Sequence, residues 1–173
     1  AGGVTVSVPE EDTSYNTRGE MIDRIRMSLG GRIAEELIMD DISTGASGDI
    51  QQATKVARSM ITRYGMSDRL GTVLYGSGHS EVFLGRDYGH TRNYSDAVAN
   101  SIDEEVRAII DECYGKAKQL LEENKAVLDA CAELLLEKER ITKEEFESIK
   151  QEAQADFEKI CQNKNIKANN GNF

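Results

Sequence analysis

A single proline, Pro9, occurs in this chain of 173 residues, and this scarcity constrains the fold more than any other feature. Proline removes a backbone donor and interrupts helices, so a chain almost free of it can form long helices. A turn-rich β architecture is disfavoured for the same reason. We therefore expect a mainly α-helical protein, long enough for one domain with its own core.

Charge and cysteine content exclude several classes of function. The net charge is −10 and the sequence pI is about 4.8. The chain therefore lacks the basic surface that is needed to bind nucleic acids or anionic membranes. Cys113, Cys131 and Cys161 show neither CxxC spacing nor even pairing, which indicates reduced thiols. No apolar stretch of about 20 residues and no signal-peptide pattern is present in the sequence. We expect no nucleic acid as a partner.

The first residues alternate in the way that is typical of a β-strand, over residues 3–9. One face of this strand carries Val4, Val6 and Val8, and the other carries Thr5 and Ser7. The pattern begins at once and without an initiator Met, which is typical of a fragment of a longer protein.

Two amphipathic helices are predicted next. Thr17 and Glu20 have the spacing of a capping box, ahead of a helix that Gly30-Gly31 should interrupt, because each glycine costs about 1 kcal/mol in a helix interior. We expect another element to approach the backbone closely there. A second helix is predicted over about 48–64, ended by Gly65 in a left-handed conformation. Its expected buried side consists of Ile50, Ala53, Ala57, Met60, Ile61 and Tyr64.

The remainder is predicted to be a glycine-rich connection over residues 71–94 followed by helices. Ser95 is expected to cap the first of them, Asn124 to mark a turn, and Thr142 to open a short helix through a second capping box. We divide the chain into a domain over residues 1–150 and a polar tail over 151–173, helical and then frayed.

One acidic loop is a candidate for chemistry. Asp49 follows the Gly/Ser/Thr loop, one or two residues inside the next helix, where a carboxylate interacts favourably with the helix dipole. Spacing alone indicates a helix-capping aspartate, since Zn²⁺ needs about four ligands. The two histidines, His79 and His90, do not form an HExxH pair and lie in the glycine-rich connection. Glu35 and Glu36 form a carboxylate pair shortly before the loop.

Taken in order, the motifs resemble the peptidase domain of the FtsH family, membrane-anchored and ATP-dependent zinc proteases. The resemblance covers roughly residues 2–150. The matching runs are GGVTVSVPEED (2–12), LGGRIAEELI (29–38), STGASGDIQQAT (43–54), AR-M-T-YGMSD-LG (57–71), FLGRD (83–87), YS-AVA-SIDEEVRAII (94–110) and LLEKERITKEEF (135–146).

This resemblance implies roles for particular residues. In the family, an upstream HExGH helix supplies two histidine ligands and the glutamate that activates the zinc-bound water, and the aspartate of the TGAxxDI motif, here Asp49, supplies the third protein ligand. Glu36 is implied to lie near the metal-binding helix and to support the zinc site without binding the ion. The strand Val4–Val8 is implied to be the edge strand with which an extended substrate pairs.

The sequence lacks three features of the family: it contains no HExGH, no Walker motif and no transmembrane helix. We therefore expect this chain to be a partial peptidase domain that is inactive and free of zinc on its own. The resemblance implies a parent that degrades membrane and misfolded proteins as a hexamer on the cytoplasmic side of a bacterial inner membrane, with ATP used by a separate AAA+ domain. The alternative is a non-catalytic helical module from a degenerate paralogue, kept for assembly or adaptor binding.

Overall fold

The structure, a computed structural model, describes residues 15–39, 41–76 and 94–163. In these ranges the chain is mainly α-helical, as predicted, and divides into two compact units, Ala1–Lys118 and Gln119–Phe173. The helices are α1 (Arg18–Ile38), α2 (Ser47–Thr62), α3 (Asp96–Glu123), α4 (Lys125–Lys138) and α5 (Lys143–Asn163). The expected strand over residues 3–9, Asp40, His79 and His90 lie outside the described residues.

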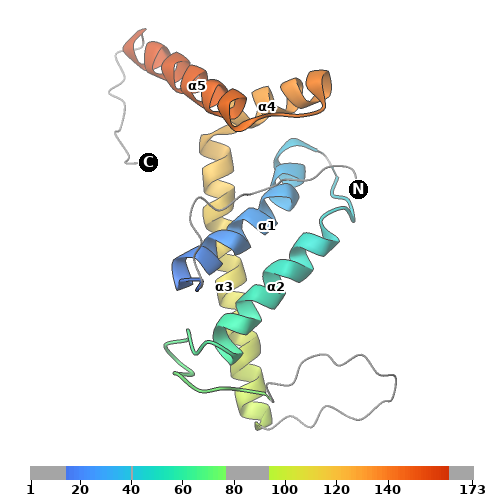
Figure 1. Ribbon diagram of the computed structural model, residues 1–173, viewed down its shortest axis with the longest axis vertical. Coiled ribbons are helices and arrows are strands. Elements are labelled where there is room, and N and C mark those ends of the chain that lie inside the picture. Colours follow the sequence, from blue (N-terminus) through green and yellow to red (C-terminus); the bar gives the residue numbers. More distant parts are fainter. Residues whose placement is uncertain (1–14, 40, 77–93, 164–173) are drawn as a thin grey trace. The chain divides into compact units, whose positions relative to one another are not determined.

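Helices α1 and α2 pack against each other and form the core of the first unit (Figure 1). On α1 the buried side chains recur every four residues, so they share one face of the helix. Burial of one such Ile or Leu side chain contributes about 1.5–3 kcal/mol. The buried side chains of the two helices are Ile25, Leu29, Ile33, Ala53, Val56, Ala57, Met60 and Ile61.

The first part of α3 adds its own apolar stripe to this unit. Its buried side chains are Ile102, Val106, Cys113 and Ala117. The stripe is flanked by polar contacts to the other two helices. Arg58 of α2 pairs with Asp103 at 2.8 Å, and Lys118 pairs with Glu36 of α1 at 2.7 Å. The three segments therefore form one helical unit.

Gly30 and Gly31 do not interrupt α1, contrary to the expectation from the sequence. The helix runs without a break from its capping box at Thr17 to Ile38, and the buried residues on both sides of the glycines hold it in place. A Cβ atom at either glycine would meet no atom of the described residues within 4 Å. The expected close approach to the backbone is therefore also absent from the part of the chain that the structure describes.

The end of α2 agrees with the prediction more closely. Gly65 adopts a left-handed conformation with φ of 60°, and a Cβ there would lie 2.7 Å from Thr72 Cα, so only glycine fits. The following turn is closed by a bridge between Ser67 and Gly71. The expected burial of Ile50 and Tyr64 was wrong, because these side chains are 44% and 54% exposed, respectively.

The second unit contains a helical hairpin of α4 and α5. The predicted capping box is present: Glu145 N donates to Thr142 Oγ1 at 3.3 Å, and Thr142 N donates to Glu145 Oε2 at 2.9 Å. Lys138 also pairs with Glu145 at 2.7 Å. The helix opened by this box is longer than expected, since it continues to Asn163. No helix in the described ranges is long and apolar enough to cross a membrane.

Candidate functional site

A short loop joins α1 to α2 and leads directly to Asp49. Met39 N donates to Glu35 O at 2.8 Å and ends α1, and α2 begins at Ser47. The described residues between them, 39 and 41–46, form the connecting loop. Both helices are anchored in the same core by their packing against each other, and this loop connects the end of α1 to the first turn of α2.

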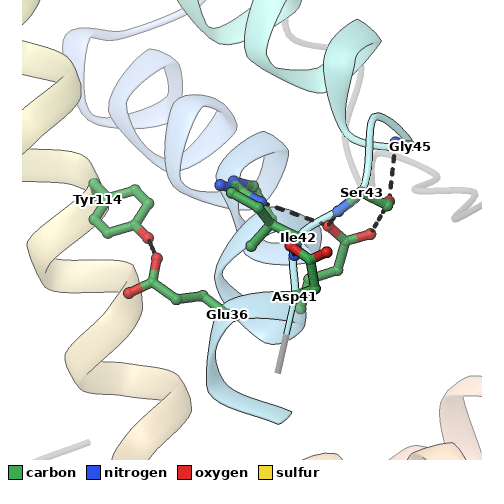
Figure 2. A network of polar contacts seen from close by, with 8 residues as sticks. Glu36, Asp41, Ile42, Ser43, Gly45 and Tyr114 are labelled. Carbon is green, nitrogen blue, oxygen red and sulfur yellow. Dashed lines mark hydrogen bonds and ion pairs between the residues drawn. The ribbon is translucent and has the colours of Figure 1, made fainter. Parts of the chain in front are cut away.

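Glu35, in the last turn of α1, holds the middle of the connecting loop. Its carboxylate accepts a hydrogen bond from Ser43 Oγ at 2.6 Å and another from Ser43 N at 3.2 Å. Ser43 Oγ in turn accepts from Gly45 N at 3.0 Å (Figure 2). These bonds lower the pKa of the Glu35 carboxyl, the side-chain bond from Ser43 being the larger cause and the backbone bond the next.

The N-terminus of α2 follows from this turn. Ser47 N donates to Thr44 O at 3.1 Å, and Ile50 N donates to Ala46 O at 3.0 Å. The N-cap residue is Ala46, which is buried and has no side-chain oxygen with which to cap the helix. The place where α2 begins is therefore defined by burial of the small apolar side chain of Ala46 and by the hydrogen bonds of the loop backbone.

Asp49 lies in the first turn of α2 with its side chain exposed. Within the described ranges its carboxylate makes neither a hydrogen bond nor an ion pair, so it does not act as a capping side chain there. Its favourable interaction with the helix dipole remains. The carboxylate is accordingly open to a ligand from outside these residues.

A zinc ion at Asp49 would need ligands from elsewhere. Among the described residues there is no group of three or more His, Cys, Asp or Glu side chains placed to hold a metal. One carboxylate oxygen is chemically suited to Zn²⁺, but a structural or catalytic zinc site takes three or four protein ligands. Asp49 fits the ion as a single ligand and cannot form the site alone.

Glu36 is engaged on the opposite side of α1 from the connecting loop. Its carboxylate accepts hydrogen bonds from the Tyr114 hydroxyl and from Lys118 Nζ, the latter at 2.7 Å, both on α3. The bond from Lys118, and after it the bond from Tyr114, lowers the pKa of Glu36. Figure 2 shows Glu36 directed toward Tyr114, with Ser43 and Gly45 on the loop beyond.

Sequence reasoning therefore singled out Asp49 and Glu36 but gave no specific role to Glu35 and Ser43. The structure brings Glu35, and not Glu36, into contact with the loop. The available signal was the position of two adjacent carboxylates in the last turn of α1, of which only one can face the loop while its neighbour faces another side.

The fold and site define a mainly α-helical domain with one carboxylate available as a ligand for a metal. A family profile described as peptidase family M41 matches residues 1–149. The chain belongs to this family, which confirms the resemblance to the FtsH peptidase domain.

Curated relatives agree with this assignment. The chain is 53% identical over 149 residues to "ATP-dependent zinc metalloprotease FtsH 1" of a Thermoanaerobacter species, covering 86% of this chain and 24% of the relative. It is 52% identical over 149 residues to the protease of the same family name from Ruminiclostridium cellulolyticum, again covering 86% and 24%. The corresponding Mycobacterium bovis protein is 51% identical over 148 residues, covering 86% and 20%. The chain thus spans only a fifth to a quarter of the length of these relatives.

Proposed function

We propose that this chain forms part of the proteolytic domain of an ATP-dependent zinc metalloprotease. The observation that carries the proposal is the family match over residues 1–149, within which Asp49 has an exposed carboxylate that no described residue engages. The names of the relatives, ATP-dependent zinc metalloproteases FtsH, give the same activity for those proteins. The reaction is the hydrolysis of peptide bonds in polypeptide substrates.

Asp49 is proposed to supply one protein ligand to zinc, and the other two to be histidines of an HExGH helix encoded upstream. When bound, the ion lowers the pKa of its water toward ~7 and polarises the scissile carbonyl. The contribution of this chain is to present one carboxylate at a fixed place beside α1. Glu36 contributes by tying α1 to α3, through Lys118 and Tyr114, so that the helix bearing Glu35 stays in position.

The remaining features of the family are proposed for the parent protein. The strand Val4–Val8 would pair with an extended substrate, whose backbone supplies the hydrogen bonds of an added strand. A separate AAA+ domain would use ATP, a hexamer would be the working assembly, and an N-terminal anchor would hold it on the cytoplasmic side of the inner membrane. Membrane proteins and misfolded soluble proteins would be the substrates of this quality-control protease.

Alone, the 173-residue chain is proposed to be inactive. One carboxylate in water binds zinc too weakly to retain it, and no HExGH glutamate is present to activate a water molecule. We expect purified chain, incubated with zinc and desalted, to carry far less than one ion and to leave casein intact. Stoichiometric zinc together with casein cleavage would contradict this.

The gene sequence upstream of Ala1 distinguishes the two functions. An HExGH motif after an ATPase domain supports the protease. Its absence from the gene supports the alternative, a helical assembly or adaptor module, and would leave Asp49 without histidine partners.

A further inference from the structure

The Ser43 hydroxyl lies at the centre of a directed set of hydrogen bonds. A hydroxyl has one donor and can accept through its lone pairs. Here the donor goes to Glu35 Oε1 at 2.6 Å, and the oxygen accepts from Gly45 N at 3.0 Å. The backbone N of Ser43 also donates to Glu35 Oε2, at 3.2 Å. One carboxylate and one hydroxyl therefore fix two backbone amides of the loop, and we call this set the Glu35–Ser43 clamp.

This clamp stands between α1 and the first turn of α2. Glu35 belongs to the last turn of α1, and Gly45 immediately precedes the N-cap of α2. Other hydrogen bonds of the described loop backbone join Ser47 N to Thr44 O, Ile50 N to Ala46 O and Ile42 N to Asp41 Oδ1. Without the clamp, the exposed loop residues would bond to water, and the start of α2 would be held only by burial of Ala46 and by the packing of α2 against α1.

The packing around Gly45 is tight, so a side chain there would force Ser43 Oγ to shift by a few tenths of an ångström. A Cβ atom at Gly45 would lie 3.1 Å from Ser43 Oγ and 3.7 Å from Glu35 Oε1. The glycine therefore permits the hydroxyl to approach the loop backbone. The geometry is consistent with a loop whose conformation is held at several points rather than by one contact.

We propose that Ser43 is a positioning residue, whose hydroxyl transmits the position of α1 through Glu35 and Gly45 to Asp49. The inference rests on the proposed function, because it assigns Ser43 a role in the placing of a zinc ligand. Ser43 touches neither substrate nor metal in this account. A carboxylate displaced by a fraction of an ångström binds the ion less tightly, and groups that orient metal ligands typically change metal affinity by about 10–100-fold.

The effect of the Ser43 hydroxyl on the loop is tested in the 173-residue chain by amide hydrogen exchange. In Ser43→Ala we expect the Gly45 amide to exchange about 10-fold faster than in the wild type, since its acceptor is removed. Ser43→Thr retains a hydroxyl at an exposed position and should preserve the protection. Ser47→Ala makes the same chemical change four residues further on, at a side chain without a hydrogen bond to the described residues, and serves as the matched control. An unchanged Gly45 exchange rate in Ser43→Ala would overturn the inference.

The effect of Ser43 on zinc binding is tested in the full-length product of the gene. Its zinc affinity is measured by titration against a competing chelator. Ser43→Ala should weaken zinc binding by about 10-fold or more, whereas Ser43→Thr and Ser47→Ala should bind as the wild type does. Zinc binding that is equally weak in Ser43→Thr and Ser43→Ala would show that the hydroxyl is not responsible, and would contradict the proposal.

The variant Asp49→Ala distinguishes a failure of the proposed function from a failure of the role assigned to Ser43. If this variant retains wild-type zinc affinity, both the proposed function and the role of Ser43 are wrong. If it loses zinc while Ser43→Ala binds zinc as the wild type does, the proposed function stands and the role of Ser43 falls.

Discussion

Glu35 accepts two hydrogen bonds from Ser43, eight residues further along the chain: one from the hydroxyl, at 2.6 Å, and one from the backbone amide, at 3.2 Å. This pairing folds the connecting loop back onto the end of α1. It leaves the neighbouring Glu36 free to bond with α3, so two adjacent carboxylates stabilise two different junctions of the same unit.

Gly45→Ala should destabilise the chain. The new Cβ would be 3.1 Å from Ser43 Oγ, so the hydroxyl has to move and its bonds weaken, and we expect a loss of about 1 kcal/mol in the free energy of unfolding. Gly48→Ala is the control, because a Cβ there meets no described atom within 4 Å and alanine favours the helix. Urea unfolding compares the two, and equal destabilisation by both would argue against the crowding at Gly45.

Gly30→Ala and Gly31→Ala should each stabilise the chain. Both glycines lie in an unbroken stretch of α1 with nothing described within 4 Å of the new methyl group, so the gain in helix propensity, up to about 1 kcal/mol each, is not offset. Thermal unfolding measures the change. A lower melting temperature for either variant would mean that another part of the chain approaches the helix there.

Acid should weaken the junction between α1 and α3 through Glu36. Its pKa is lowered in the folded state, from an ordinary value of 4.5, by hydrogen bonds from Lys118 and Tyr114. A lowered pKa stabilises the fold above the unfolded pKa, and this contribution is lost as the pH falls through the folded one. Below pH 4.5 the wild type should therefore lose stability more steeply than Glu36→Gln.

Urea midpoints at about pH 7 and about pH 3 test this pH dependence. Glu122→Gln, an exposed carboxylate on α3 without a hydrogen bond to the described residues, is the matched control and should follow the wild type. Parallel curves for the wild type and Glu36→Gln would show that the ion pair contributes nothing measurable.

Local signals in the sequence predicted the ends of elements well. The capping boxes at Thr17 and Thr142 and the left-handed Gly65 depend on residues within three or four positions of one another, and all were confirmed. The prediction that Gly30-Gly31 would interrupt α1 was wrong. The cost of Gly30-Gly31 is small beside the burial of residues such as Ile25 and Ile33 on the same helix.

The site was only partly predictable for a related physical reason. Asp49 could be singled out because its motif is local, and its placement in the first turn of a helix follows from the loop residues before it. The bond from Glu35 to Ser43 spans a loop whose path depends on packing of α1 against α2 and on burial of Ala46, neither of which has a local signal. The same holds for the choice of Glu36 as the partner of Tyr114 and Lys118.

The central claim is that Asp49 is a zinc ligand, and the metal content of the full-length gene product tests it most directly. Wild-type protein and the variants Asp49→Ala and Asp41→Ala would be purified, equilibrated with zinc, desalted and analysed by atomic emission. Asp41 is an exposed acidic residue of the same loop, and among the described residues its carboxylate accepts a bond only from the adjacent Ile42 amide, so it controls for loss of charge.

We predict about one zinc per chain in the wild type and in Asp41→Ala, and a loss of most of the metal in Asp49→Ala. Zinc content in Asp49→Ala equal to that of the wild type would contradict the account.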